Sequence, residues 1–562
     1  MDYKFLNTIN RRFINAAGEY PNRPALSSKP SGAKSWVTLT YREVEERVRY
    51  FASGLRTLGV KRGDRVAMLS ENRPEWAIAD LASQAIGAIT VSVYPTLPPS
   101  QVAHILSDSG SRAIIVSDAN QLKKALKNPD VSPDLDIFIT MDDSSAKGDI
   151  LSFEQVLNAG RIAETSSPEE FRKVSFEVEP HDIISLIYTS GATNSPKGVM
   201  ITHANMTTAV DIGLAGFPIH PPDDVFLSFL PLCHVFERVA YCISLTTGSH
   251  TYYNDSIFKL MDNILDARPT IMQCVPRVYE SMHERMLEAI GSAPVEDLDP
   301  AQKAALKARF GGRLECFISG GAPLNPATNE FFNAIGLPII EGWGLTETTA
   351  AATVNPVERI KTGTVGPACL GVELKTAVDG EILVRGGNVM KGYWNNPDAT
   401  AEALEPDGWL HTGDIGEIDP DGYLKITDRK KDIIVLPNGK KVAPQPIEKR
   451  IRTNPYITDV VLISDSAGSV GALVVPDYAQ LAQWAKDRGI HAESGALARH
   501  PDARKFIKKQ IDVSAGELAD FEKIRKVALL ERPLSVDAGE LTPTLKLKRR
   551  IIAENYAALL SL

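Results

Sequence analysis

The segment 184–200 combines residue types that bind an anion with the spacing of a loop after a strand. An apolar, β-prone run ends at Thr189 and Ser190, and Gly191 and Lys197 follow. Hydroxyl and backbone N–H groups of such a loop can converge on phosphate oxygens, and glycine allows backbone conformations closed to other residues. Lys197 adds a mobile positive charge. We interpret the segment as a phosphate-binding loop.

The loop differs from the common P-loop, in which glycine precedes the lysine and serine or threonine follows it. Here Pro196 precedes Lys197 and Gly198 follows it. A polar surface turn beside a strand is the alternative interpretation. The Pro-Lys-Gly ending and the buried type of strand before the loop favour phosphate binding.

A second cluster, residues 341–348, follows an apolar run at 337–340 that we expect to be a strand. Gly342 and Gly344 flank Trp343, so its indole could lie flat against a ligand. Glu347 offers the hard oxygen ligand that Mg²⁺ prefers. The alternative is that Trp343 simply belongs to the core.

Two other glycine-containing loops are less specific. Residues 319–324 read Ser-Gly-Gly-Ala-Pro-Leu after the apolar run 316–318, which alone is typical of a turn. Residues 408–414 end in Asp414, whose carboxylate could accept both hydroxyls of a ribose. An aspartate in such a loop more commonly stabilises its own turn.

Two further segments have both a structural and a functional interpretation. His234 lies in an apolar stretch, where a histidine is more often part of the core than a ligand. Residues 541–550 form a basic run, usually a solvated tail. The Thr-Pro-Thr at 542–544, before a Lys-Leu-Lys alternation, instead indicates an ordered loop.

In this order the motifs resemble those of the adenylate-forming superfamily, which includes acyl-CoA synthetases, luciferases and the adenylation domains of peptide synthetases. The loop there usually reads Tyr-Thr-Ser-Gly-Thr-Thr-Gly-x-Pro-Lys-Gly, so Ala192 and Asn194 are departures. Asparagine tolerates left-handed backbone angles. Ala192 lacks a hydroxyl, so backbone groups and Thr193 must supply that contact. The resemblance spans nearly the whole chain.

The resemblance implies a role for each matching residue. Lys197, Thr346, Glu347 and Lys546 are the implied catalytic residues, and Glu347 also binds the metal. Asp414 binds ribose, and Arg429 contacts ribose or phosphate. The implied nucleotide-binding residues are Thr189, Ser190, Gly191, Thr193, Lys197, Gly320, Gly321, Ala322, Pro323, Glu341, Gly342, Trp343, Gly344, Thr346, Asp414, Ile426, Arg429 and Lys546.

The same resemblance narrows the substrate. His234, Gly342 and Gly344 correspond to residues that border the acyl group, and the His-x-Phe-Glu-Arg sequence at 234–238 looks like that of long-chain fatty acyl-CoA synthetases. Residues 275–280, Val-Pro-Arg-Val-Tyr-Glu, look like the same branch.

The catalytic lysine of the C-terminal motif is assigned from the alignment of this segment with the family's motif. Thr544-Leu545 stands before Lys546 where Ser-Gly is usual, a variant similar to that of the long-chain branch. Lys548 and Arg549 are the alternatives to Lys546 for the catalytic lysine. Lys431 falls at the family's hinge position.

The implied reaction activates a long-chain fatty acid with ATP and Mg²⁺ to an acyl-adenylate, and then transfers the acyl group to coenzyme A. Transfer to a carrier protein instead of coenzyme A is one alternative. A non-catalytic acyl- or nucleotide-binding protein is another, although Lys197, Glu347, Asp414, Arg429 and Lys546 together argue against it. A luciferase-like oxidation has no support in the sequence.

The strands and helices expected around these motifs indicate an α/β fold. Strands and helices alternate over residues 37–118, including strands at 65–69, 88–93 and 113–116 and helices at 41–58 and 100–108. This alternation is typical of parallel sheet covered on both faces. We expect a solvated connector at 164–182, a second α/β unit from Ile183 to about Ile340, and a surface loop at 291–302.

From Gly363 short β-type runs at 381–384 and 423–426 alternate with turns such as Asp421-Gly422, a hairpin signal. We therefore predict a large N-terminal adenylation domain, 1–429, made of two α/β subdomains and a β-rich subdomain. A small mobile α/β domain, 430–562, follows it.

Composition excludes several classes of protein. A chain of 562 residues is too long for one core, and its formal net charge of −9 excludes nucleic acid as the main partner. Five isolated cysteines indicate reduced, buried thiols. We find no secretory signal at residues 1–5 and expect a cytoplasmic protein. Peripheral contact with the inner face of the membrane and a homodimer remain open.

Overall fold

The computed structural model describes residues 6–30, 33, 35–126, 132–167, 169–189, 196–291, 294–436, 440–464, 469–490, 494–542 and 547–560. The chain forms two compact units. The first comprises residues 1–375, 383–412 and 418–425, and the second comprises residues 376–382, 413–417 and 426–562. The predicted domain boundary after Arg429 stays a prediction.

The first unit contains an eight-stranded sheet in the order β18-β9-β8-β4-β3-β5-β6-β7. Its strands from β8 to β7 are parallel, whereas β9 is antiparallel to both β8 and β18. The strands are β3 (Arg65–Leu69), β4 (Ile89–Val93), β5 (Ala113–Val116), β6 (Ile137–Thr140), β7 (Ile150–Ser152), β8 (Ile183–Thr189), β9 (Lys197–Thr202) and β18 (Gly392–Tyr393). The three strands predicted between residues 65 and 116 are confirmed.

A second eight-stranded sheet has the order β15-β14-β13-β12-β10-β11-β1-β2. It is parallel from β14 to β1 and closes with an antiparallel strand at each edge. The strands are β1 (Pro24–Ser28), β2 (Val37–Thr40), β10 (Val225–Ser228), β11 (His250–Tyr253), β12 (Ile271–Cys274), β13 (Cys316–Ser319), β14 (Ile339–Trp343) and β15 (Thr353–Val354).

The prediction that a second α/β unit begins at Ile183 is wrong. Strand β8 pairs with β4, with Thr90 opposite Ser185, and therefore belongs to the first sheet. The N-terminal strand β1 instead pairs with β11 of the second sheet, with Leu26 opposite Thr251. Apolar runs buried on both faces predict parallel strands but carry no information on which of two sheets they join.

Alternate residues of the strands face different cores, as the pleat of a strand requires. Val66 and Met68 of β3 belong to a core shared by the two sheets, whereas Ala67 and Leu69 pack against helices on the outer face. In the second sheet Phe226 of β10 faces the shared core. Leu227, the next residue of β10, packs against the outer helices.

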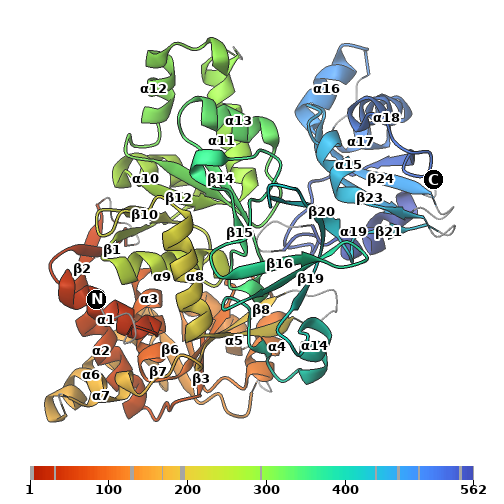
Figure 1. The fold of residues 1–562 in the computed structure, drawn as a ribbon. Coiled ribbons are helices and arrows are strands. Elements are labelled where there is room, and N and C mark those ends of the chain that lie inside the picture. The colour runs from red at the N-terminus through yellow and green to blue at the C-terminus, as the bar shows by residue number, and fades with distance from the viewer. Residues whose placement is uncertain are drawn as a thin grey trace. The chain divides into compact units, whose positions relative to one another are not determined.

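Helices of the shared core lie between the two sheets (Figure 1). They are α1 (Ile9–Glu19), α3 (Pro74–Ala85), α8 (His203–Gly216) and α9 (Val235–Thr247), with α2 (Tyr41–Thr57), α6 (Phe153–Ser166) and α7 (Glu170–Phe176) at one end. Helices α4 (Pro99–Ser109) and α5 (Ala119–Leu126) cover the outer face of the first sheet. Helices α10 (Leu260–Ala267), α11 (Pro276–Ala289), α12 (Pro300–Ala308) and α13 (Pro326–Ala334) cover that of the second.

Two predicted loops are wrong. The connector expected at 164–182 contains α7, because Phe171 and Ser175 face the core while the charged residues between them face solvent. Glu164, at the end of α6, is buried and accepts hydrogen bonds from Ser53 and Arg49.

The loop expected at 291–302 is also shorter. Val295 and Leu298 are buried, and α12 begins at Pro300. Asp299 caps this helix in a capping box with Gln302.

The β-type runs predicted after Gly363 are strands. These are β16 (Val372–Thr376), β17 (Glu381–Gly386), β19 (Leu410–Ile418) and β20 (Leu424–Arg429), and α14 (Pro397–Ala403) precedes β19. The turn at Asp421-Gly422 joins β19 and β20, and Gly422 has a positive φ of 84° that favours glycine.

The second unit has a three-stranded sheet, β23-β24-β25, with helices on both faces. Helices α15, α16, α17 and α18 pack on one face, and α19 packs on the other. The elements are β21 (Ile434–Val435), β22 (Lys441–Val442), α15 (Pro444–Ile451), β23 (Ile457–Ser464), β24 (Val470–Pro476), α16 (Tyr478–Lys486), α17 (Ser494–Arg499), α18 (Pro501–Ala515), β25 (Ile524–Leu529) and α19 (Arg549–Tyr556). The mixed α/β fold is thus confirmed.

The expectation about the thiols is confirmed for four of the five cysteines. Cys233, Cys242, Cys274 and Cys316 are buried free thiols, whereas Cys369, also free, is only partly buried. Among the described residues, no helix is both long enough and apolar enough to span a bilayer.

A buried ion pair joins the helices of the shared core. Arg238 of α9 contacts Asp80 of α3, and both side chains have an exposed fraction of 0%. Arg238 also donates to Ser92 of β4 (2.8 Å) and Ser185 of β8 (3.0 Å), and Thr90 donates to Asp80 (2.7 Å). Two charges are buried here because each is surrounded by hydrogen-bonding partners.

Replacement of Arg238 by methionine should destabilise the first unit by about 3–5 kcal/mol, because Asp80 would remain buried without its partner. Urea unfolding followed by tryptophan fluorescence measures the change. The matched control is Arg385→Met, which breaks the exposed pair of Arg385 with Glu373 and should leave stability almost unchanged. Equal effects of the two variants would contradict the importance of the buried pair.

Candidate active site

Three of the predicted segments meet at the carboxyl edge of the second sheet. His234 follows β10, residues 320–323 follow β13, and Trp343 ends β14. Parallel strands place these ends at one edge, where ligands of α/β proteins commonly bind. A Cβ built on Gly320 would lie 3.4 Å from the ring of Phe236 and 3.7 Å from the carbonyl oxygen of Gly342. The structure therefore brings the three segments together.

The loop after β13 leaves its backbone accessible. Gly321, Ala322 and Pro323 are exposed, whereas the preceding strand is buried. Gly321 has a positive φ of 83°, a conformation that favours glycine.

The segment at the end of β14 is more tightly packed. Glu341 is buried and accepts a hydrogen bond from Asn329 (3.1 Å). Trp343 is 9% exposed and pairs with Thr353 of β15. A Cβ on Gly344 would lie 1.6 Å from the carbonyl oxygen of Ala350, so the turn after Trp343 requires glycine.

His234 is the N-cap of α9, and its ring nitrogen Nδ1 accepts a hydrogen bond from the backbone of Phe236 (3.2 Å). It is half-buried at the carboxyl edge. Three residues further along α9, the fully buried Glu237 accepts a hydrogen bond from Gln273 of β12 (2.8 Å). Burial raises the pKa of Glu237 to about 7, against hydrogen bonds from Ser228 and Gln273 that lower it.

The predicted phosphate loop joins two antiparallel strands. Thr189 ends β8 opposite Lys197, which begins β9. Ser190, Gly191 and Thr193 lie outside the described residues, as do Ala192 and Asn194.

Lys197 and Glu347 converge on Tyr393. The Lys197 Nζ atom lies 5.1 Å from the centroid of the Tyr393 ring, and the Tyr393 hydroxyl donates to Glu347 Oε1 (2.8 Å). Glu347 and Thr346 belong to a short 3₁₀ turn (Thr346–Thr348), and both are partly exposed. Sequence reasoning missed Tyr393, which belongs to none of the motifs.

Glu347 fits the metal role that the sequence predicts. Mg²⁺ usually takes one or two carboxylates together with substrate phosphates and waters. No described residue donates a hydrogen bond to Glu347 Oε2, which leaves that oxygen available. Within the described ranges, no three His, Cys, Asp or Glu side chains form a group that could hold a metal by themselves. The chemistry therefore suits a metal that arrives with a polyphosphate.

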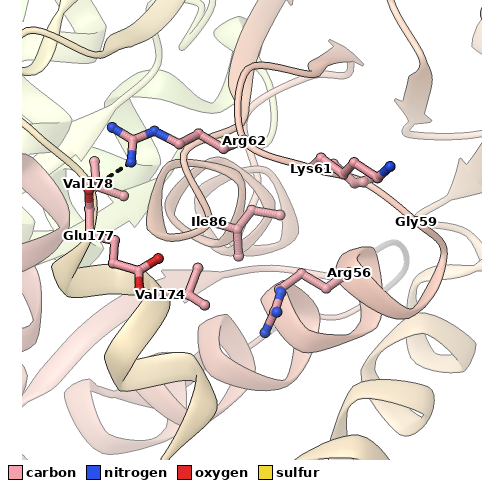
Figure 2. Close-up of a pocket in the computed structure, with 9 residues that line it drawn as sticks. Arg56, Gly59, Lys61, Arg62, Ile86, Val174, Glu177 and Val178 are labelled. Atoms are coloured by element: carbon pink, nitrogen blue, oxygen red, sulfur yellow. Dashed lines mark hydrogen bonds between the residues drawn. The ribbon is translucent and has the colours of Figure 1, made fainter.

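Of two cavities in the first unit, one is lined by Lys197 and the other by none of the predicted site residues that the structure describes. One, of ≈ 400 Å³, is lined by Pro196 and Lys197 together with residues of α4 and of the segment 394–402. The other, of ≈ 350 Å³, places Arg56, Lys61 and Arg62 around Ile86 (Figure 2). No predicted site residue lines it.

The cations of the second cavity are largely engaged by the protein itself. Arg62 donates to the carbonyl oxygen of Glu177 (2.9 Å) and to the Asp182 carboxylate (2.5 Å), and Arg56 pairs with Glu170 (2.9 Å). The cavity therefore offers less positive charge than its lining indicates.

In the second unit the two predicted ribose-binding residues meet. Arg429 Nε lies 2.8 Å from Asp414 Oδ1, with Asp414 buried and Arg429 half-exposed. Ile426, two residues before the buried Asp428, is partly buried. Lys431, the predicted hinge, is exposed and directly follows Lys430, which pairs with Asp379 and Glu381.

The C-terminal basic run contains a structural arginine. Lys546 lies outside the described residues, and Leu541 and Leu547 on either side of its segment form an antiparallel bridge. Arg549 is 13% exposed and donates to both carboxylate oxygens of Glu448 and to the carbonyl oxygen of Leu462. These contacts fix α19 to α15 and β23, which disfavours Arg549 as the catalytic cation.

Comparison with known proteins decides the family. Residues 13–394 match the model of the AMP-binding enzyme family, and residues 431–558 match that of the AMP-binding enzyme C-terminal domain. The chain belongs to the AMP-binding enzyme family. The resemblance inferred from the motifs is confirmed.

The relatives are similar over almost their whole length. A long-chain-fatty-acid–CoA ligase of Mycobacterium tuberculosis is 32% identical, with 93% of this chain and 92% of that protein covered. Long-chain-fatty-acid–CoA ligase 6 of Homo sapiens is 32% identical, with coverage of 99% and 86%. The structure of a Mycobacterium tuberculosis fatty acyl CoA synthetase matches with a TM-score of 0.69 and 26% identity, over 99% of each chain.

The pKa of Glu237 predicts a pH-dependent contribution to stability. In the unfolded chain this carboxyl has an ordinary pKa near 4.3, whereas in the folded protein it is about 7. Its contribution is fully present below about pH 4.3 and is lost as the pH rises from there through 7, by up to roughly 4 kcal/mol.

Glu237→Gln keeps a side chain of the same shape and cannot ionise. The melting temperatures of the variant and the wild type should therefore diverge between pH 5 and pH 8, with the wild type losing stability relative to the variant. Parallel curves would contradict the raised pKa.

Proposed function

We propose that this AMP-binding enzyme is a long-chain fatty acid–CoA ligase. It activates the carboxylate with ATP to an acyl-adenylate and pyrophosphate, and then transfers the acyl group to coenzyme A with release of AMP. The observation that carries the proposal is the convergence of Lys197 and Glu347, at the base of the predicted phosphate loop, on one tyrosine. The names of the relatives support the same class of substrate.

The first half-reaction needs positioning more than proton transfer. A carboxylate is already an adequate nucleophile, so the protein must hold it in line with the α-phosphate and neutralise the developing charge. Lys197, Thr189 and Ser190 would hold the phosphates, with charge-assisted hydrogen bonds worth about 1.5–3 kcal/mol each. Glu347 would hold the Mg²⁺ that is bound with ATP, and this ion would neutralise phosphate charge.

The nucleoside is assigned to the remaining motifs. Residues 320–323 and 341–344 would bind adenine through their backbone and the Trp343 ring, and Asp414 with Arg429 would bind the ribose. Thr346 and Ile426 complete this set. Buried Asp414 already accepts a charge-assisted contact from Arg429, which suits a carboxylate that must stay ionised to accept hydroxyl hydrogen bonds.

Before the second half-reaction, the group that holds the acyl-adenylate must move away so that the thiol of coenzyme A can reach the acyl carbon. Lys546 would bridge the carboxylate and the α-phosphate in the first step. Rotation of a lid domain, residues 430–562, about Lys431 would then withdraw it and admit the thiol of coenzyme A. Closure about a few residues at the end of a strand is a common form of domain motion.

The acyl group is assigned to the carboxyl edge of the second sheet. His234, Gly342 and Gly344 would border the carboxyl end of the fatty acid, and the apolar start of α9 would follow its chain. Leu232 and Val235 on either side of this histidine segment are apolar, as contact with a hydrocarbon requires.

A chain-length panel tests the substrate. Pyrophosphate release from ATP should be strongest with fatty acids of about twelve or more carbons, because each buried methylene contributes about 0.8 kcal/mol. Release is measured with and without coenzyme A, with acetate and an amino acid as controls. A preference for acetate or the amino acid would contradict the proposal, and acyl transfer only to a carrier protein would favour the alternative acceptor.

Lys546→Ala tests the role of the C-terminal lysine. Adenylation should fall by about 100-fold or more, since a charge aimed at the reacting phosphate is lost. Thioester formation from supplied acyl-adenylate should remain, because that step does not use the lysine. Both half-reactions are measured separately, with the exposed Lys509→Ala as the control.

Equal loss of both half-reactions would contradict the step-specific role. The same selective loss in Lys548→Ala, with Lys546→Ala active, would show that the register of the motif is shifted by two residues.

A further inference from the structure

Tyr393 is held against the strand that begins with Lys197. Strand β18 pairs antiparallel with β9, and Tyr393 lies opposite Val199. On either side of it, the backbone N–H groups of Lys391 and Trp394 donate to carbonyl oxygens of β9 (3.0 and 2.8 Å). The N–H of Tyr393 itself donates to Thr400 Oγ1 (2.9 Å). The position of the phenol is therefore set by the backbone of the predicted phosphate hairpin.

The phenol ring connects the predicted metal ligand to the predicted phosphate lysine. Its hydroxyl donates to Glu347 Oε1 at 2.8 Å, and its face receives the Lys197 ammonium at 5.1 Å from the ring centroid. Met390, three residues before Tyr393, donates from its backbone to the carbonyl oxygen of Glu347 (2.8 Å). Both the side chain and the backbone of Glu347 are thus fixed by the segment 390–393.

The geometry makes the phenol a hydrogen-bond donor to the carboxylate. Its hydroxyl lies 2.8 Å from Glu347 Oε1, and an ionised carboxylate oxygen only accepts hydrogen bonds. The contact occupies Oε1, so the carboxylate would bind a cation through Oε2.

We propose that Tyr393 is a positioning residue for ATP activation: its hydroxyl orients the Glu347 carboxylate for the divalent cation, and its ring holds Lys197 for the polyphosphate. Groups that orient a metal ligand commonly change metal affinity or activity by 10–100-fold when they are removed. A lysine ammonium within about 6 Å of an aromatic ring centroid is attracted to the face of the ring. The proposal rests on the proposed function, because it concerns the metal and ATP of that reaction.

The two contacts of Tyr393 can be separated by substitution. Tyr393→Phe removes the hydroxyl and keeps the ring, whereas Tyr393→Leu removes both contacts. Isothermal titration calorimetry measures the dissociation constant of ATP with Mg²⁺ and, separately, with EDTA, in the absence of fatty acid. This readout does not require turnover.

For Tyr393→Phe we expect binding of ATP with Mg²⁺ to weaken by about 10-fold, the lower end of the range for such groups. Its binding of ATP with EDTA should be unchanged. For Tyr393→Leu, binding with EDTA should weaken as well, because Lys197 loses the ring. The half-saturating Mg²⁺ concentration for pyrophosphate release should rise in Tyr393→Phe, with the KM for the fatty acid unchanged.

Tyr423→Phe is the matched control, since it also removes one partly buried phenol hydroxyl that donates a hydrogen bond, in this case to the carbonyl oxygen of Arg359 (2.8 Å). It should bind ATP like the wild type under both conditions. If Tyr393→Phe keeps the wild-type ratio of the two dissociation constants, the proposal for Tyr393 is overturned. Wild-type protein that binds ATP with Mg²⁺ and yet releases no pyrophosphate with any acid would instead overturn the proposed function and leave the Tyr393 result valid.

Discussion

The buried contact between Arg238 and Asp80 is the constraint on which the first unit depends. Two sheets share one layer of helices, and this layer buries polar side chains of the first sheet, Thr90, Ser92 and Ser185. Arg238 reaches from α9 to Ser92 and Ser185 of the first sheet, and Asp80 accepts from Thr90 and Gln84. Removal of either charge would leave the other unpaired in the core, where desolvation is costly. The network therefore favours one relative placement of helix and sheet.

The placement of α9 against the first sheet also positions two parts of the candidate site. Arg238 lies four residues after His234 on α9, at the carboxyl edge of the second sheet, and its partner Ser185 lies four residues before Thr189 on β8. One guanidinium thus joins the helix assigned to the acyl group and the strand assigned to the phosphates. Because hydrogen bonds and charge contacts act over a few ångströms, a shift of α9 by one helical turn would break the network.

The sequence predicted local elements well and their association poorly. Strands 65–69 and 113–116 were identified to the residue, since uninterrupted apolar runs bounded by polar residues are typical of buried parallel strands. The assignment of β8 to a new unit failed, because strands of both sheets have the same apolar pattern. The helix at 170–176 was missed since its buried residues are few and its charged residues many.

In the candidate site, too, the sequence identified residues that belong to local motifs and missed one whose position depends on a distant strand pairing. Lys197, Glu347 and Asp414 stood out because each charged residue lies close to glycine in the sequence and because their order matched that of a family. Tyr393 carried no such signal: its neighbours form no chemical pattern, and 46 residues separate it from its carboxylate partner. Its importance arises from the pairing of β18 with β9, a contact between distant parts of the chain.

Pairing of this kind allows a two-residue strand to position a side chain of the candidate site. Strand β18 comprises only Gly392 and Tyr393, too short to be stable alone, and it persists because β9 supplies its hydrogen bonds. Gly392 has a positive φ of 142°, and a Cβ there would lie 2.7 Å from the Thr400 side chain. Glycine therefore lets the chain turn closely past α14 and present Tyr393 to Glu347. The phenol reaches its partners because the residue before it has no side chain.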